Sequence, residues 1–106
     1  MKLYFKNPHF DSGLNSTVRN GLKWASVPPG TKLEICKTDE DNVLTEAILR
    51  HAITTKAGDL SDEILFCQHD PATKTVDGLN KVLKDCYNES YDPETSDLTI
   101  LFFWVD

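Results

Sequence analysis

The alternation of apolar and polar residues predicts four β-strands in this chain. Two of them place alternate apolar residues on one side, Leu3 and Phe5 in the first and Leu33 and Ile35 in the second. The third also fits a helical stripe, and we assign it as a strand because it ends on Ile-Thr-Thr before an Ala-Gly-Asp turn. The fourth is apolar on both faces, which is typical of a central, doubly covered strand. The four segments are 2–5, 31–37, 44–55 and 98–105.

Two further segments carry the signals of helices. Ser61 can cap a short helix over residues 61–68, with acidic residues in its first turn. Thr75 can cap a second helix in the same way. That helix has an apolar stripe at helical spacing, formed by Val76, Leu79, Leu83, Cys86 and Tyr87. These elements predict an α+β fold, a curved sheet or small β-barrel with two helices.

Length and composition indicate one globular domain over residues 1–106. The chain has 106 residues, 40% of them hydrophobic, and a net charge of −6. No apolar run reaches the roughly 20 residues that span a bilayer, and the first residues lack the apolar core of a signal peptide. We therefore expect a cytoplasmic protein without a membrane partner, whose three cysteines are reduced and mostly packed.

The charge is polarised along the chain. Residues 1–37 contain six basic and two acidic side chains, whereas residues 38–106 contain five basic and fifteen acidic ones. The net negative charge of the chain disfavours tight, sequence-independent binding to long nucleic acids. A small anionic or nucleotide ligand at one basic site is compatible with this distribution.

The most concentrated polar stretch is 13–24. Arginine offers a planar fork for phosphate or carboxylate, tryptophan a stacking face for a base, and hydroxyl or amide groups can recognise exocyclic atoms. The alternative is structural: a tight turn at 20–21, a tryptophan that covers the core and an arginine in a surface ion pair. The candidate substrate-binding residues in this stretch are Asn15, Ser16, Arg19 and Trp24.

The order of motifs resembles the ASCH domains, RNA-associated relatives of the PUA fold. The resemblance rests on Gly13-x-Asn15-x-Thr17-Val18-Arg19, then Gly21-x-Lys23-Trp24, then Pro29-Gly30-x-Lys32-Leu33-x-Ile35, with a helix at 76–87 and a strand at 98–104. It implies a PUA-like small β-barrel with two or three short helices and a cleft for RNA or a modified nucleoside. Some small bacterial members remove the acetyl group of N4-acetylcytidine with a lysine, a threonine and a glutamate, and others are reported as ribonucleases.

Carried over to this chain, the resemblance implies the catalytic set Thr17, Lys23 and Asp70. Thr17 and Arg19 match the hydroxyl and the arginine of the family motif, but the expected place of the lysine holds Leu14 or Asn15. Asn15 cannot accept a proton, so Lys23 would act as general base or activate the nucleophile. Thr17 would orient or attack the acyl carbon, Arg19 would anchor the substrate, and Asp70 would carry the proton, with Glu63 as another candidate carboxylate.

The histidines and cysteines indicate no metal site or cofactor. The chain has no HxH, HExxH or CxxC motif. We interpret the Cys-Gln-His-Asp run at 67–70 as the polar end of a helix. His51 should share a face with Leu49 and Ile53, as a core or cleft histidine.

A second class of function fits the acidic part of the chain. On the same fold, residues 38–106 could engage a basic protein partner while the cleft is vestigial. The acidic loops at 39–41 and 91–94 would then form the contact.

Overall fold

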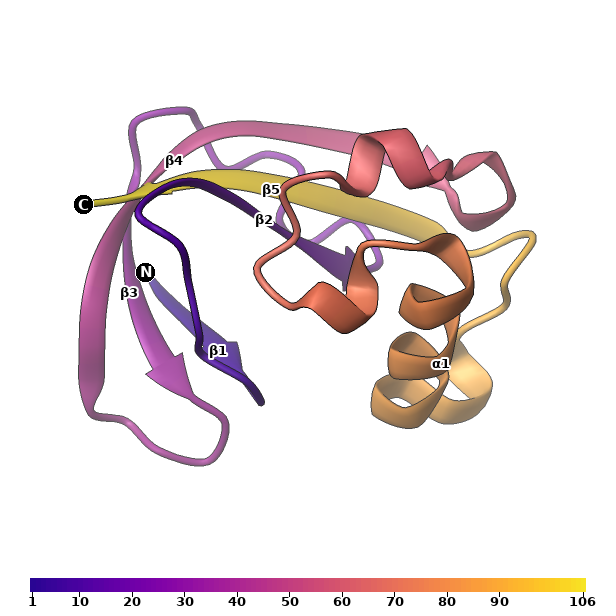
Figure 1. Ribbon diagram of the computed structural model, residues 1–106, viewed down its shortest axis with the longest axis horizontal. Coiled ribbons are helices and arrows are strands. Elements are labelled where there is room, and N and C mark those ends of the chain that lie inside the picture. The colour runs from indigo at the N-terminus through magenta and orange to yellow at the C-terminus, as the bar shows by residue number, and fades with distance from the viewer.

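Five β-strands form one curved sheet in the computed structural model, which describes residues 1–106 (Figure 1). The strands are β1 (Lys2–Phe5), β2 (Gly13–Asn20), β3 (Lys32–Lys37), β4 (Val43–Lys56) and β5 (Asp97–Val105). One α-helix, α1 (Val76–Tyr87), accompanies four 3-10 helices, η1 (Ala57–Asp59), η2 (Asp62–Leu65), η3 (Pro71–Thr73) and η4 (Asn88–Ser90). The α+β class and the four predicted strands are confirmed, whereas β2 was not predicted as a strand.

The sheet is open rather than closed into a barrel. Its strand order is β1-β3-β4-β5-β2, with β1 parallel to β3 and every other pair antiparallel. β1 and β2 are therefore the two edges, and no backbone ladder joins them. The barrel closure that we expected is wrong in this respect, because β1 has only four residues and pairs with β3 alone.

The apolar core lies on both faces of β5, as its sequence predicts. Leu101 and Phe103 belong to the cluster that contains the buried residues of β1 and β3. Leu98 and Ile100 face the other way, into a second cluster with Leu79 and other residues of α1. Figure 1 shows α1 at one end of the long strands β4 and β5, with β1 and β3 towards the opposite end. β5 thus links the two halves of the core.

A bulge in β4 corrects the expected position of His51. The pairing with β5 shifts between Leu49 and His51, so that Leu49 lies opposite Phe103 and His51 lies opposite Phe102. An extra residue at a bulge reverses the alternation of side chains beyond it. His51 is consequently exposed, and it does not share the buried face of Leu49.

One of the two predicted helix caps is present. The Thr75 hydroxyl accepts a hydrogen bond from the backbone N–H of Gly78 at 3.1 Å, as predicted. The predicted cap at Ser61 is wrong, because its side chain makes no such bond, and the 61–68 segment contains only the one-turn helix η2. The neighbouring Asp62 instead accepts from the N–H of Val76 at 2.7 Å, which ties η2 to the start of α1.

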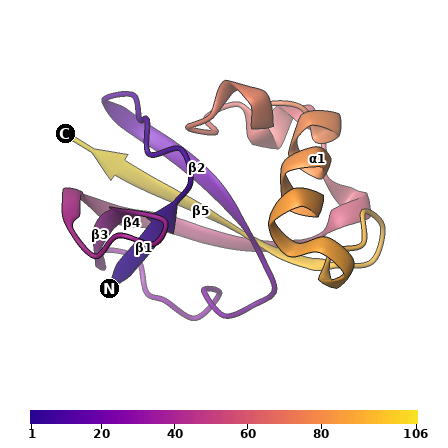
Figure 2. The ribbon, with the colours of Figure 1, turned by 90° about the horizontal axis from the view of Figure 1, so that it is seen from below.

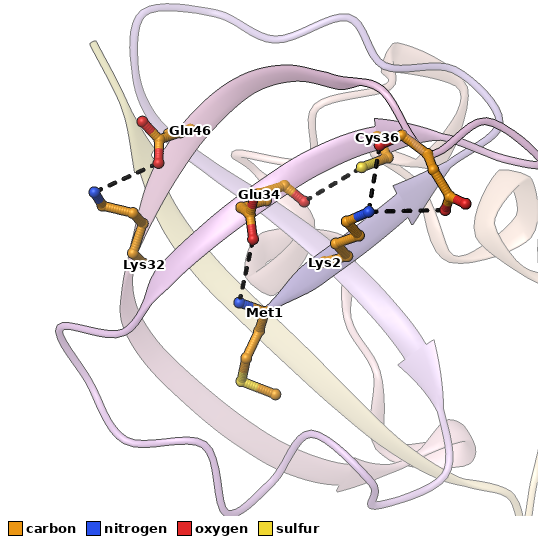
Figure 3. A network of polar contacts seen from close by, with 7 residues as sticks. Met1, Lys2, Lys32, Glu34, Cys36 and Glu46 are labelled. Atoms are coloured by element: carbon orange, nitrogen blue, oxygen red, sulfur yellow. Dashed lines mark hydrogen bonds and ion pairs between the residues drawn. The ribbon is translucent and has the colours of Figure 1, made fainter.

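The edge strand β1 is held chiefly by its apolar side chains. Figure 3 shows the polar contacts around it, which include a 3.9 Å ion pair between the N-terminal amine of Met1 and Glu34. Lys2 approaches the carboxylate of Asp41 at the same distance. Exposed pairs of this kind stabilise a fold by about 0–1 kcal/mol each. Leu3 and Phe5, both buried in the core, provide more.

None of the helices has the length and apolar character that crossing a membrane would need.

We predict that Gly78→Ala destabilises the protein, although alanine is the better helix former by about 0.5–1 kcal/mol. A Cβ at this position would collide with the backbone carbonyl oxygen of Ala72 in η3, which cannot rotate away as a side chain could. We expect the free energy of unfolding, measured in urea, to fall by about 1 kcal/mol or more. The exposed control Lys81→Ala should change it little, and a stabilised Gly78→Ala protein would contradict the close contact.

Candidate ligand-binding cavity

A cavity of about 310 Å³ opens between the two edge strands of the sheet. Its walls come from four places in the sequence: the end of β1 with the residues after it, the second half of β2, the 68–73 segment, and one face of α1. This volume lies at the lower end of the roughly 300–1,000 Å³ of small-molecule sites. The cavity therefore suits one small ligand rather than an extended polymer.

The position of the cavity depends on backbone pairing between β2 and the 67–69 segment. The N–H of Ser16 donates to the carbonyl of Cys67 at 2.8 Å, and the N–H of His69 donates to the carbonyl of Ser16 at 3.2 Å. This parallel bridge lies on the outer edge of β2 (Figure 2). The 67–70 run is thus more than the polar end of a helix, because it lies beside β2 and lines the cavity.

Polar residues occupy the core-facing positions of β2. Asn15 and Thr17 lie opposite the core residues Phe103 and Leu101 of β5, and Arg19 lies opposite Thr99. Directly opposed residues in an antiparallel pair share a face of the sheet. The side of β2 that would normally carry apolar residues therefore carries an amide, a hydroxyl and a guanidinium.

Arg19 contributes a partly buried cation that has no ion-pair partner. Its Nε is inaccessible to solvent and has no hydrogen-bond partner, and its guanidinium carbon lies 4.7 Å from the centre of the Phe5 ring. None of the four ion pairs in the molecule includes Arg19. Burial lowers the pKa of Arg19, yet an arginine stays protonated at neutral pH. The surface ion pair considered for this residue is therefore absent.

Gln68 adds a second buried donor. The side chain is 3% exposed, and its Nε2 has no hydrogen-bond partner. The hydroxyl of Thr73 donates to the carbonyl of Asp70 at 2.8 Å and lies 3.4 Å from Oε1 of Gln68. A buried donor left without a partner costs about 1–3 kcal/mol of stability.

His69 is a neutral imidazole in the cavity wall. Its Nδ1 lies 3.3 Å from the carbonyl oxygen of His9, which can only accept, so Nδ1 carries the proton and Nε2 keeps a lone pair. The ring packs edge-on against Phe5 at a centroid distance of 4.9 Å. Burial is the main cause that lowers the pKa of His69, and the positive charge of Arg19 adds to the effect.

Three of the residues predicted from sequence line the cavity, namely Thr17, Arg19 and Asp70. Asp70 also caps η3, because its carboxylate accepts from the N–H of Ala72 at 3.0 Å. The hydroxyl of Ser16 is fully buried and has no hydrogen-bond partner, but Ser16 is not part of the cavity lining.

The other predicted residues have structural positions. The amide of Asn15 donates to the carbonyl oxygens of Asp11 and Gly13 at 2.8 and 3.2 Å, which holds the loop before β2. Trp24 packs against the core, as the structural alternative proposed. Lys23 is exposed and lies over the Trp24 ring, 5.8 Å from its centre, outside the cavity.

Several cavity residues were not predicted. The end of β1 and the residues after it supply Tyr4, Lys6 and Asn7, and α1 supplies Cys86 and Tyr87. Cys86 and Tyr87 belong to the apolar stripe predicted for the helix. Nothing in the sequence pattern predicts that β1 lies near β2. No group of three or more histidine, cysteine, aspartate or glutamate side chains is placed so that it could hold a metal ion.

Comparison with solved structures identifies the architecture. The chain superposes on an ASCH domain from Lactobacillus crispatus JV V101 with a TM-score of 0.66, over 86% of this chain and 63% of that one, at 8% sequence identity. The chain has an ASCH-like fold. It spans less than two thirds of the length of that domain structure. No protein-family model matches the sequence, and no curated protein matches it significantly.

We predict that His69 makes the protein less stable as the pH falls. Because its pKa is lowered in the folded state, the unfolded chain binds more protons below about pH 6.5. The free energy of unfolding should therefore decrease from pH 7 towards pH 5 more steeply for the original protein than for His69→Gln. The matched variant His51→Gln alters an exposed histidine and should retain the original slope. Identical slopes for all three proteins would contradict a buried, neutral His69.

Proposed function

We propose that this protein binds a nucleoside, or the terminal nucleotide of an RNA, in the cavity between β1 and β2. The observation that carries the proposal is a cavity of nucleoside size whose wall combines aromatic side chains with hydrogen-bonding groups, among them Tyr87, Gln68 and Thr17. Small-molecule sites are typically apolar and aromatic clefts with a few polar groups that fix the orientation of the ligand. The ASCH-like fold supports the same function by resemblance.

The composition of the wall suits a base with polar edges. Tyr4, Phe5 and Tyr87 provide aromatic surface, while Gln68 and Thr17 provide groups that can recognise carbonyl and amino substituents. Aromatic contact is worth about 1–3 kcal/mol per base, and the hydrogen bonds give selectivity. A cavity of about 310 Å³ has room for a single nucleoside, so an RNA would be recognised at an exposed end or a splayed base.

Amidohydrolase activity on an N4-acetylcytidine-type substrate requires a different lysine from the one that we first assigned. Lys6 lines the cavity together with Thr17 and Asp70, whereas Lys23 lies outside it. In this arrangement Lys6, which is exposed and cationic, would stabilise the developing oxyanion, Thr17 would orient or attack the acyl carbon, and Asp70 would carry the proton. His69, with a free lone pair on Nε2, offers a further proton acceptor in the same wall.

The acidic interaction module stays a prediction. Part of its proposed contact surface is already used within the chain: Asp41 accepts from the hydroxyl of Tyr4 at 2.8 Å, and Asp92 accepts from the N–H groups of Glu94 and Thr95. We therefore favour the cavity over the acidic loops as the functional site.

We predict that Gln68→Met weakens nucleoside binding about threefold to tenfold, which corresponds to one neutral hydrogen bond. Methionine keeps the length of the side chain and removes both of its polar atoms. The measurement is isothermal titration of cytidine, uridine and N4-acetylcytidine. Lys23→Ala should bind them as the original protein does, because Lys23 is outside the cavity.

Cysteine modification gives an independent readout of occupancy. Cys86 is exposed and lines the cavity, whereas Cys36 is buried in the core and serves as an internal reference. A bound nucleoside should slow the alkylation of Cys86 by a maleimide. If no nucleoside and no short single-stranded RNA binds or protects Cys86, the proposed function is wrong.

Any deacetylation of N4-acetylcytidine should depend on Lys6 and not on Lys23. We expect Lys6→Ala and Thr17→Val to lower kcat by about 100-fold or more, as is usual for the loss of an oxyanion-stabilising group or a nucleophile. Lys23→Ala should retain the original rate. Product formation followed by chromatography provides the measurement, and loss of activity in Lys23→Ala would return that residue to the site.

A further inference from the structure

The positive charge of Arg19 has no counter-ion inside the protein. Ion pairs at up to 4.0 Å hold Met1, Lys2, Lys32 and Lys56, but not Arg19. Asp70 is the carboxylate of the cavity wall, and one of its oxygens accepts the N–H of Ala72 at 3.0 Å rather than a hydrogen bond from the guanidinium. Arg19 is partly buried, and burying a charge without a partner is unfavourable.

The surroundings hold the guanidinium in place while leaving its charge uncompensated. The Phe5 ring covers it at 4.7 Å, and Nε is fully inaccessible. Lys6 adds a second cation to the same wall, so that two cationic side chains face one carboxylate in a protein whose net charge is −6. This local excess of positive charge contrasts with the rest of the surface and favours an anion.

Arginine is the side chain best matched to an oxyanion of planar or tetrahedral geometry. Its donors lie in a fixed fork, and hydrogen bonds between two charged groups are about twice as strong as neutral ones. A neutral nucleoside would leave this capacity unused. A phosphate monoester attached to the nucleoside would use it.

We propose that the ligand of this cavity is a nucleoside monophosphate, or the phosphorylated end of an RNA, whose phosphate pairs with Arg19. The inference rests on the proposed function and makes it more specific, because it places a charged group on the ligand. Gln68 and the aromatic side chains then contact the nucleoside, while Arg19, assisted by Lys6, holds the phosphate.

The first test compares matched ligands by isothermal titration. Cytidine, its 5′- and 3′-monophosphates and inorganic phosphate are titrated into the same protein. We expect at least one monophosphate to bind about tenfold or more tightly than cytidine, as for a charge-assisted pair. Arg19→Gln should bring the affinities for the monophosphate and for cytidine close to each other, and Arg19→Lys should restore part of the preference.

The chain offers a matched control in Arg50. It also lies over an aromatic ring, 5.2 Å from the centre of Trp104, but it is exposed and does not line the cavity. Arg50→Gln should therefore leave the preference for the monophosphate unchanged. If Arg50→Gln reduces it as much as Arg19→Gln does, the phosphate binds the surface by general attraction and the proposal is wrong.

The melting temperature of the protein provides a second measurement. Replacing an unpaired, desolvated cation by an apolar side chain of similar length should not destabilise the fold, so the melting temperature of Arg19→Met should equal or exceed that of the original protein. Phosphate and the monophosphate should raise the melting temperature of the original protein and not that of Arg19→Met. A large loss of stability in Arg19→Met would show that the cation serves the fold.

The outcomes of these titrations distinguish the phosphate inference from the nucleoside-binding function. If cytidine and its monophosphates bind equally well, the phosphate inference is wrong and the nucleoside function stands. If none of them binds, both are wrong. A preference for the monophosphate that depends on Arg19 supports both.

Discussion

The outer edge of β2 is the constraint on which the site depends. An edge strand presents unpaired backbone groups, and here the sheet cannot satisfy them by closing, because β1 is short and pairs only with β3. The 67–69 segment satisfies two of them at Ser16 instead. That pairing covers part of the edge and places Gln68 and His69 next to Thr17 and Arg19. The opening between the edges remains as a lined cavity.

The fold and the site make opposite demands on β2. Its neighbour β5 is apolar on both faces, and the two clusters that it joins supply most of the buried apolar surface. β2 instead carries polar groups on its core-facing positions, and Arg19 Nε, Ser16 Oγ and Gln68 Nε2 remain unsatisfied. Such groups reduce stability, and the burial of the large apolar core offsets their cost.

These opposing demands explain which parts of the molecule the sequence predicts. Strands whose alternation reflects burial, such as the one containing Leu33 and Ile35, and a helix with an apolar stripe are found at nearly their true positions. β2 is missed because its inward positions are polar. His51 is misplaced because a bulge leaves no mark in composition. Tyr4 and Lys6 are missed because their contact with β2 follows from the strand order and not from any local pattern.

The ASCH-like fold alone does not determine the chemistry of the cavity. At 8% identity, the shared architecture reflects strand order and the placement of apolar residues rather than particular functional side chains. Residues from four separate stretches of sequence line the cavity, so the shared fold by itself assigns no role to a cation such as Lys6, which follows β1. Arg19 is the more specific feature, because the Phe5 ring lies over its guanidinium and no ion pair of the chain includes it, so its charge is free for the anionic ligand proposed above.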